Sequence, residues 1–191
     1  MNIEFEATFP NISIADVQSR LHKVGAKCVK KRTLYKRVTF NLPHRDPKEH
    51  IWGRVRDEGN VITMTIKEWQ DDGIAGQKEL ELQVDNYDTA VAFMNKLGCI
   101  PKSYQETYRE EWRIRDVHVT LDEWPWLEPL IEIEGKSEEA VKEIVAKLGF
   151  DYSQAMFMTV TALYMDKYGL SQYEIDNNIP RITFEENPFV R

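Results

Sequence analysis

Charged residues stand two positions apart in several short stretches, which places both members of each pair on one face of an extended strand. The acidic pairs are Glu4 and Glu6, Glu79 and Glu81, and Glu132 and Glu134, and Asp122 adds a further carboxylate. The basic residues in similar stretches are Arg54, Arg56, Lys67 and Arg109. Carboxylates from several strands suit Mg²⁺ or Mn²⁺, and arginine and lysine suit phosphate oxygens. Together they predict a site for a polyphosphate and a divalent metal ion.

The stretches that carry these charges alternate polar with apolar residues, as strands with one polar and one apolar face do. In residues 3–9, the apolar side chains take one face, and Glu4, Glu6 and Thr8 take the other. The alternation predicts about eight antiparallel strands, at residues 3–9, 34–40, 52–56, 61–67, 78–84, 104–114, 117–122 and 130–134.

The charges are also sorted by strand, with the acidic pairs on the first, fifth and eighth strands and the basic residues on the third, fourth and sixth. Such sorting fits a closed or nearly closed barrel with a polar lumen, whose apolar outer face is covered by helices. It equally fits an open, solvated sheet held by cross-strand ion pairs. The pattern alone leaves both α+β arrangements open.

Four helices are predicted between and after the strands. The first follows Ser13, the second runs near residues 88–97, and the third follows Ser137. Each of these ends in a Lys-x-Gly sequence, which suits the C-terminus of a helix. A fourth helix is predicted over residues 153–168. We expect residues 1–168 to form the barrel domain, and residues 169–191 to form a tail that is either part of that domain or a loose arm.

The composition argues against several classes of protein. A net charge of −7 over 191 residues disfavours nucleic acid or an anionic membrane as the partner. No apolar run approaches the ~20 residues of a transmembrane helix, and the N-terminal strand is unlike a signal peptide. Cys28 and Cys99 lack any zinc-like spacing, so both are predicted to be reduced thiols in a cytoplasmic protein.

The order of the charged motifs resembles the CYTH family, the triphosphate tunnel metalloenzymes, which include class IV adenylyl cyclases and thiamine triphosphatases. The likeness spans roughly residues 1–165. It rests on Glu4-Phe5-Glu6, Arg54-Val55-Arg56, Thr65-Ile66-Lys67, Glu79-Leu80-Glu81, Arg109, Leu121-Asp122-Glu123 and Ile131-Glu132-Ile133-Glu134. The resemblance implies an eight-stranded antiparallel tunnel with helices packed on the outside.

The resemblance also implies roles for individual residues. The phosphate clamp would be Arg54, Arg56, Lys67 and Arg109. The leading metal ligands would be Glu4, Glu6 and Glu132, with Glu134, Asp122, Glu79 and Glu81 as further candidates. The catalytic centre would comprise Glu4, Glu6, Arg54, Arg56, Lys67 and Arg109, and Mg²⁺ or Mn²⁺ would be the cofactor.

Three positions depart from the family pattern. The lysine of the first family motif is Thr8 here, and a second lysine, on the sixth strand, is Thr107. On the second strand, where many members carry an acidic residue, this chain has Arg37. We expect Arg37 to replace one lost positive charge and to join the phosphate-binding residues. The loss at Thr8 affects hydrolysis more than binding, because that lysine is a proposed helper of the attacking water.

Three functions fit these observations. The overall length and the Gly25-Ala26 turn slightly favour a class IV adenylyl cyclase, which converts ATP to cAMP and pyrophosphate. The alternative is a triphosphatase that hydrolyses inorganic, nucleoside or thiamine triphosphate. Thr8 and Thr107 motivate a third reading, a non-catalytic binder of nucleotide or polyphosphate. In each case the expected partner is a small-molecule triphosphate, and a homodimer is compatible with the family.

Overall fold

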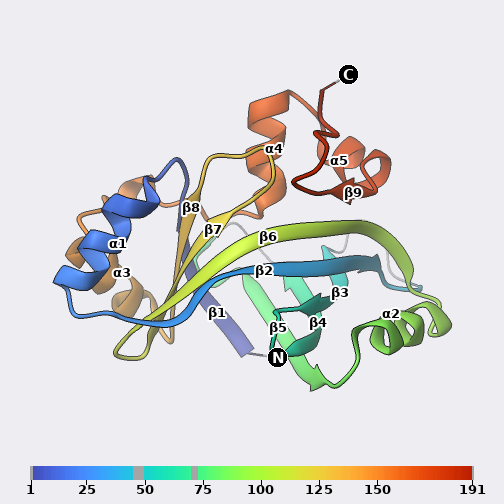
Figure 1. Ribbon diagram of the computed structural model, residues 1–191, viewed down its shortest axis with the longest axis horizontal. Helices are drawn as coiled ribbons and strands as arrows, with labels where there is room; N and C mark the ends of the chain where they lie inside the picture. The colour runs from blue at the N-terminus through green and yellow to red at the C-terminus, as the bar shows by residue number, and fades with distance from the viewer. Residues whose placement is uncertain (1, 45–49, 70–72, 191) are drawn as a thin grey trace.

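Eight antiparallel strands close into a barrel, and pairing between the two longest strands completes the closure (Figure 1). The computed structural model describes residues 2–44, 50–69 and 73–190. The order around the barrel is β2-β3-β4-β5-β1-β8-β7-β6, with β6 returning to β2. The strands are β1 (Asn2–Phe9), β2 (Lys27–Asn41), β3 (Ile51–Asp57), β4 (Ile62–Trp69), β5 (Gln77–Val84), β6 (Ile100–Ile114), β7 (Val117–Glu123) and β8 (Leu130–Gly135). The predicted barrel is confirmed, and the open sheet is excluded.

The two closing strands are longer than the alternation predicted. β2 begins at Lys27 rather than at Leu34, and β6 begins at Ile100 rather than at Tyr104. The added residues of β2 are mostly polar, so their sequence is like that of a loop. They nevertheless pair with β6, with a shift of register on either side of Lys30. Such irregularities let a long strand bend as it follows the barrel wall.

Helices cover much of the apolar outer face of the barrel, although Leu80 and Leu82 of β5 stay exposed. α1 (Ile14–Lys23) and α3 (Glu138–Lys147) share one core with strands β1, β7 and β8, in which Leu21 and Ile144 are buried. α2 (Tyr87–Lys96) packs on the opposite side, where Met94 contacts a smaller core with Phe40 and Val55. Burying each such side chain contributes about 1.5–3 kcal/mol. The polar faces of the same strands are thereby left to line the interior.

Short sequence signals set the ends of these helices. The hydroxyl oxygens of Ser13 and Ser137 accept hydrogen bonds from the backbone amides of Asp16 and Ala140 at the first turns of α1 and α3. α1 and α3 end just before Gly25 and Gly149, whose φ angles of +76° and +75° favour glycine. These predicted helix boundaries are confirmed.

The predicted fourth helix is wrong in its first half. A single turn of 3₁₀ helix covers Tyr152–Gln154, the chain then runs extended, and α4 spans only Val160–Tyr168. The extended segment pairs with β1, because the backbone groups of Thr8 and Met156 exchange two hydrogen bonds, at 3.1 and 2.9 Å. This tertiary pairing outweighs the helical propensity of the segment.

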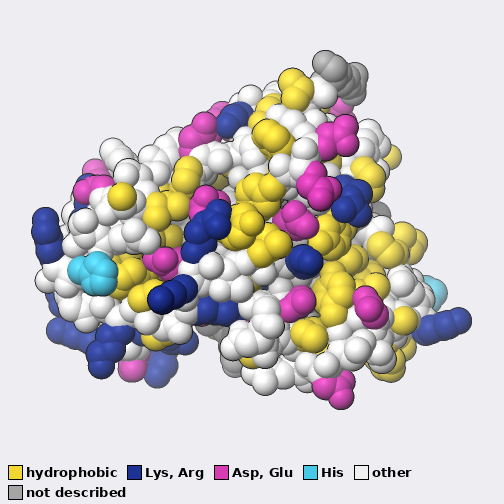
Figure 2. Space-filling view, in the orientation of Figure 1, with side chains coloured by type: hydrophobic (Ala, Val, Ile, Leu, Met, Phe, Trp, Pro, Cys, Tyr) yellow, Lys and Arg dark blue, Asp and Glu magenta, His cyan; other side chains and the backbone are white. Residues whose placement is uncertain are grey.

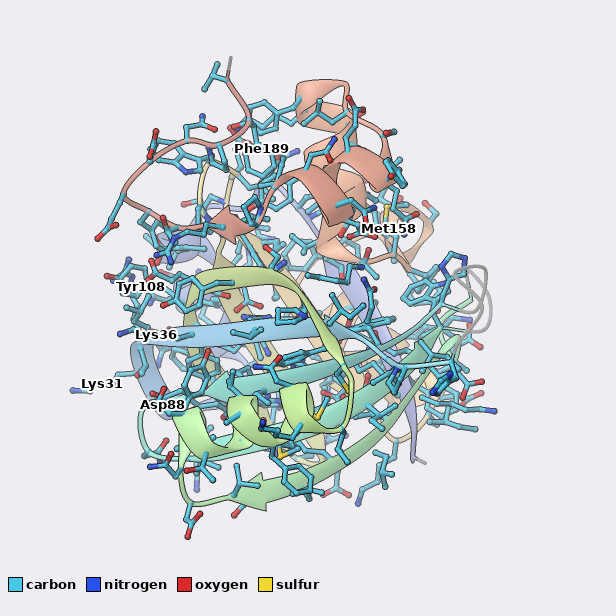
Figure 3. The ribbon with its side chains drawn as sticks, turned by 90° about the vertical axis from the view of Figure 1, so that its right-hand side faces the viewer. Lys31, Lys36, Asp88, Tyr108, Met158 and Phe189 are labelled. Carbon is cyan, nitrogen blue, oxygen red and sulfur yellow. The ribbon has the colours of Figure 1, made fainter. Side chains whose placement is uncertain are left out.

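The C-terminal residues form a layer on one side of the barrel, together with α4 (Figure 1). α5 (Gln172–Asn178) was not predicted, and β9 (Arg181–Ile182) runs parallel to β6. Figure 3 shows Phe189 within this layer, above β6. The ring of Phe189 stacks on Tyr164 at 4.3 Å and on Tyr168 at 4.8 Å between centroids. Trp124, in the turn after β7, is buried in the same cluster.

The exterior has its own charge distribution, separate from that of the barrel interior. Figure 2 shows lysine and arginine side chains gathered at the lower left, near α1 and the adjoining ends of β2 and β6. Arg37 and Arg54 are buried and contribute nothing to this surface. No helix in the described part of the chain is long and apolar enough to cross a membrane.

Candidate functional site

The polar faces of the strands meet inside the barrel. Lys67 of β4 reaches Glu4 of β1 at 3.1 Å, although β5 lies between these strands. Arg109 of β6 reaches Glu132 of β8 at 2.6 Å across β7. Side chains on strands that are not neighbours can meet in this way only on the concave side of the sheet. The lumen therefore gathers the charged residues that the sequence pattern singled out.

One ion-pair cluster lies where β3, β4, β5 and β1 meet. The guanidinium of Arg54 lies 3.2 Å from Glu79 and 3.5 Å from Glu81. The ammonium of Lys67 lies 2.8 Å from Glu79 and 3.1 Å from Glu4. Burial raises the pKa of Glu79, but Glu4, Lys67 and Arg54 outweigh that effect and hold it well below its usual range. These cations therefore share their carboxylate partners when no ligand is bound.

A second cluster is built around Arg109. Its Nε and Nη2 atoms each donate to the carboxylate of Asp122 at 2.6 Å, and Nη2 also donates to Glu132 at 2.6 Å. Asp122 is fully buried and accepts a further hydrogen bond, of 3.0 Å, from the hydroxyl of Thr120. Two-pronged arginine–carboxylate pairing of this kind fixes both side chains. The cluster forms the wall of the lumen opposite β3 and β4.

Carboxylates outnumber their cations along β1 and β8. Glu6 and Glu134 are directly opposite each other in the strand pairing, and Glu132 is two residue pairs further along, on the same face of β8. Burial raises the pKa of Glu6 well above its usual range, and the carboxylate of Glu132 raises it further. Burial likewise raises the pKa of Glu4 to about 7. A cation bound to this wall would stabilise the ionised form of these carboxylates.

A divalent cation fits the donors on this wall, although they are not drawn together around a common point. Hard carboxylate oxygens from adjacent strands are the ligands that Mg²⁺ and Mn²⁺ prefer. Among the described residues, no three acidic, histidine or cysteine side chains converge closely enough to hold an ion as they stand. Several candidates are instead paired with cations: Asp122 with Arg109, and Glu79 and Glu81 with Arg54. Glu6 forms no ion pair in the described part of the chain.

Buried arginines line the wall formed by β2 and β3. Arg37 and Arg56 are directly opposite each other in the strand pairing, and Arg54 is two residues along from Arg56. The Nε atoms of all three are buried and have no hydrogen-bond partner among the described residues. Burial, together with the neighbouring charge of Arg56, lowers the pKa of Arg54 to about 10. This side of the lumen is therefore suited to an anion.

The three departures from the family pattern lie in the lumen as well. Arg37 donates a hydrogen bond to the hydroxyl of Thr107, so the position of one missing lysine is in contact with the added arginine. Thr8 is 6 % exposed and is opposite Glu132 in the strand pairing. A small cavity beside Thr8 is also lined by Glu132 and Met156. None of the residues that line this cavity is a lysine or an arginine.

One group of lumen residues was not predicted from the sequence. Tyr35 and His118 both hydrogen-bond to Glu111, the latter at 3.1 Å, and Glu111 has a pKa lowered to about 2. Burial opposes that shift, but His118 and Tyr35 outweigh it. A usable signal was present, because Thr107, Arg109 and Glu111 continue the same alternation along β6.

The twelve predicted site residues fall within one lumen, but their exposure differs. Lys67, Glu79, Glu4 and Arg56 have side chains that are 12–15 % exposed, whereas Glu81 and Glu134 are 37 % and 42 % exposed. The last two therefore lie nearer to solvent than the rest. The predicted convergence of basic and acidic residues is present in the structure, and their assignment to phosphate or metal remains a prediction.

Comparison with known proteins settles the family. The family profile described as CYTH domain matches residues 5–160, which is most of the chain. The chain belongs to the CYTH family. The comparison with curated proteins finds no match. The match to the CYTH profile covers all eight strands of the barrel except the first residues of β1.

Solved structures share the fold at low sequence identity. A putative adenylate cyclase from Vibrio parahaemolyticus aligns with a TM-score of 0.73 and 9% identity, covering 85% of this chain and 97% of that one. A conserved hypothetical protein from Pyrococcus furiosus aligns with a TM-score of 0.68 and 20% identity, covering 82% and 96%. A putative adenylyl cyclase from Hippeastrum with a dominant triphosphatase activity aligns with a TM-score of 0.57 and 14% identity, covering 90% and 97%. At these identities the likeness establishes the CYTH fold and not the reaction.

Proposed function

We propose that this CYTH chain binds a small-molecule triphosphate together with Mg²⁺ or Mn²⁺ inside its barrel and acts on it. The observation that carries the proposal is the division of the lumen into two walls of opposite charge. Arg54 and Arg56 have buried Nε atoms without partners on one wall, and Glu6 is held among carboxylates on the other. A polyphosphate with its cation is a ligand that satisfies both walls at once.

The roles follow from the two walls. Arg54, Arg56 and Lys67 would neutralise phosphate oxygens, since guanidinium and ammonium groups bind these oxygens strongly. Glu6, Glu132 and Glu134 would hold the divalent cation, whose chemistry is to neutralise charge on the phosphate chain.

The ion pairs of the free protein would then be exchanged for ligand contacts. Lys67 is shared between Glu4 and Glu79, and Arg54 between Glu79 and Glu81. A phosphate chain in the lumen competes with these carboxylates for the same donors. The ion pairs keep the cations oriented inward while the site is empty of substrate, which reduces the reorganisation that binding requires.

Of the two reactions, we infer that cyclisation of ATP fits this chain better than hydrolysis. In cyclisation the 3′-hydroxyl oxygen of the ribose attacks the α-phosphorus and the new O–P bond forms. Pyrophosphate leaves with the electrons of the broken P–O bond, and the proton of the hydroxyl passes to the pyrophosphate or to water. The nucleophile belongs to the substrate, so the enzyme mainly aligns it. Hydrolysis needs a positioned water, and the position where a helper lysine would stand is the buried, uncharged Thr8.

Hydrolysis of a triphosphate is the second candidate function. The observation that favours it is the structural likeness to the Hippeastrum protein, which combines the cyclase name with a dominant triphosphatase activity. Both reactions use the same clamp and differ only in the nucleophile and in the phosphorus that is attacked.

³¹P NMR of the purified protein with Mg²⁺ or Mn²⁺ separates these possibilities. We expect ATP to yield pyrophosphate and a cyclic monophosphate. Orthophosphate from ATP or from inorganic triphosphate would instead establish a triphosphatase. If both substrates survive while their resonances broaden with added protein, the chain is a binder and the proposal of catalysis is wrong. Arg54→Gln is the matched control, since removing a clamp residue should abolish turnover and broadening alike.

A further inference from the structure

Arg37 differs from every other predicted phosphate-binding side chain in the lumen. Arg54, Arg56, Lys67 and Arg109 each form an ion pair with at least one carboxylate. Arg37 is 6 % exposed and forms no ion pair in the described part of the chain. A buried charge without a counter-ion is costly to a folded protein. Closing the barrel does not require an unpaired buried charge, because the predicted phosphate-binding cations on β3, β4 and β6 all pair with carboxylates.

The contacts that Arg37 does make hold it in place without neutralising it. One terminal nitrogen donates to the hydroxyl of Thr107, which is itself fully buried and uncharged. The guanidinium carbon lies 4.5 Å from the ring centroid of Trp124, a cation–π distance. These contacts fix the plane of the guanidinium. The Nε atom is buried and has no hydrogen-bond partner among residues 2–44, 50–69 and 73–190.

The charges nearest to this guanidinium are mostly positive, and the buried carboxylate of Asp122 acts on it without forming an ion pair. Arg56 is directly opposite it in the strand pairing, and Arg54 follows on the same face of β3. Each of the three Nε atoms lacks a partner, and so does the buried indole nitrogen of Trp124. Four buried donors of this kind, on residues from three segments of the chain, have no acceptor among the described residues. Such a set of donors is matched by an anion with several oxygens.

We propose, as an extension of the function proposed above, that Arg37 and Trp124 form a receptor for the terminal phosphoryl group of the bound triphosphate. Only a terminal group offers three unbridged oxygens and a charge approaching −2 to a cluster of this kind. Arg54 and Arg56 would reach the same group from β3. The C-terminal layer contributes indirectly, because its packing holds Trp124 against Arg37.

The test is Arg37→Met, with inorganic triphosphate and cyclic trimetaphosphate as probes. Trimetaphosphate carries three phosphoryl groups but no terminal one. Binding is measured by titration calorimetry in EDTA, so that metal-dependent turnover does not consume the probe. We expect Arg37→Met to weaken binding of linear triphosphate roughly 10- to 100-fold, the loss typical of a hydrogen bond to a charged group. Binding of trimetaphosphate should be unchanged.

The stability of the free protein supplies a second readout. Removing a buried charge that forms no ion pair with the described residues should raise Tm, by roughly 2–4 °C, while affinity falls. Lys36→Gln is the matched control, because Lys36 is the exposed neighbour of Arg37 on β2 and is labelled in Figure 3. It should change neither the affinity nor Tm by a comparable amount.

Several outcomes would overturn the receptor. Unchanged affinity for linear triphosphate, an equal loss for both probes, or a fall in Tm would each show that Arg37 has a different role. If Arg37→Met does not fold, Arg37→Lys is measured instead. A phosphate receptor predicts weaker binding of linear triphosphate by this variant, whereas a purely structural cation predicts unchanged binding. Arg54→Gln separates the two proposals: if it too leaves triphosphate binding intact, the proposed function fails and not only the receptor.

Discussion

Arg109 offers a quantitative test of the lumen electrostatics. Among the described residues, Arg109 is the one cation that forms an ion pair with Asp122, whose side chain is 0 % exposed, and it also pairs with Glu132 at 2.6 Å. Replacing it with methionine removes both ion pairs. Breaking a buried ion pair by removing one member typically costs about 3–5 kcal/mol. Against a usual stability of about 5–15 kcal/mol, Arg109→Met should lose about a fifth or more of the free energy of unfolding.

The cost should depend on pH in a defined direction. Burial already raises the pKa of Asp122 to about 6 with Arg109 present. A carboxyl with a raised pKa stabilises the fold when protonated and loses that contribution as pH rises. Without Arg109 the pKa rises further, so the stability gap between wild type and variant should be large at pH 8 and small at pH 5.

Urea unfolding followed by circular dichroism at several pH values measures this gap. Arg113→Met is the control, because Arg113 lies on the same strand but is exposed. A loss below ~1 kcal/mol at pH 8, or an equal loss at pH 5, would refute the assignment of Arg109 as the cation that holds the buried carboxylates in place.

Three further predictions test other parts of the lumen. Glu6→Gln should raise Tm in the absence of metal, because Glu6 and Glu132 repel each other. It should also abolish stabilisation by Mg²⁺ or Mn²⁺, because it removes a proposed ligand. Thermal melts with and without metal check both results, and a lower metal-free Tm would contradict the first. Burial lowers the pKa of His118, but hydrogen bonds to Glu111 and Glu134 outweigh that effect and raise it. The contribution of His118 to stability is therefore complete below about pH 6.5 and is lost as the pH rises through the higher pKa of the folded state. His118→Gln should remove that part of the decline in urea midpoint, and an identical decline would show that other groups cause it. Thr8→Lys should place an ammonium in the cavity beside Glu132 and raise orthophosphate release from triphosphate, as measured by a phosphate assay. If release does not rise and the variant only melts at a lower Tm, the idea of a missing helper lysine is wrong.

The sequence predicted the lining of the barrel well, because alternation is a local property. Each strand's polar face can be read from its own residues, and the pairs Glu4 with Glu6 and Arg54 with Arg56 point inward as expected. The helix ends followed from their serine caps and glycine stops. Closure of the barrel could not be derived from alternation, since an open sheet shows the same pattern. The resemblance to the CYTH family supplied it.

The contacts that distinguish this chain could not be predicted from local sequence patterns, because they join residues far apart in the sequence. Pairing of Thr8 with Met156 joins segments far apart in the sequence, and it holds extended a segment that was predicted to be helical. The meeting of Arg37 with Thr107 and Trp124 depends on the register of β2 against β6 and on the turn after β7. Which carboxylate neutralises which cation likewise depends on strand order, and residue types alone do not specify it.

The place of β1 in the barrel has a consequence for how the protein is made. β1 pairs with β5 and β8, so Phe5 must find Gly135 across most of the chain. Synthesis proceeds at about 5–20 residues per second, so β1 waits on the order of ten seconds or more on the ribosome before β8 emerges. Until then the edge of β1 that pairs with β8 is open to other chains, even if the other edge has already paired with β5. Contacts of such long sequence separation slow folding, and co-translational protection of the first strand should decide how much of the protein reaches the native state.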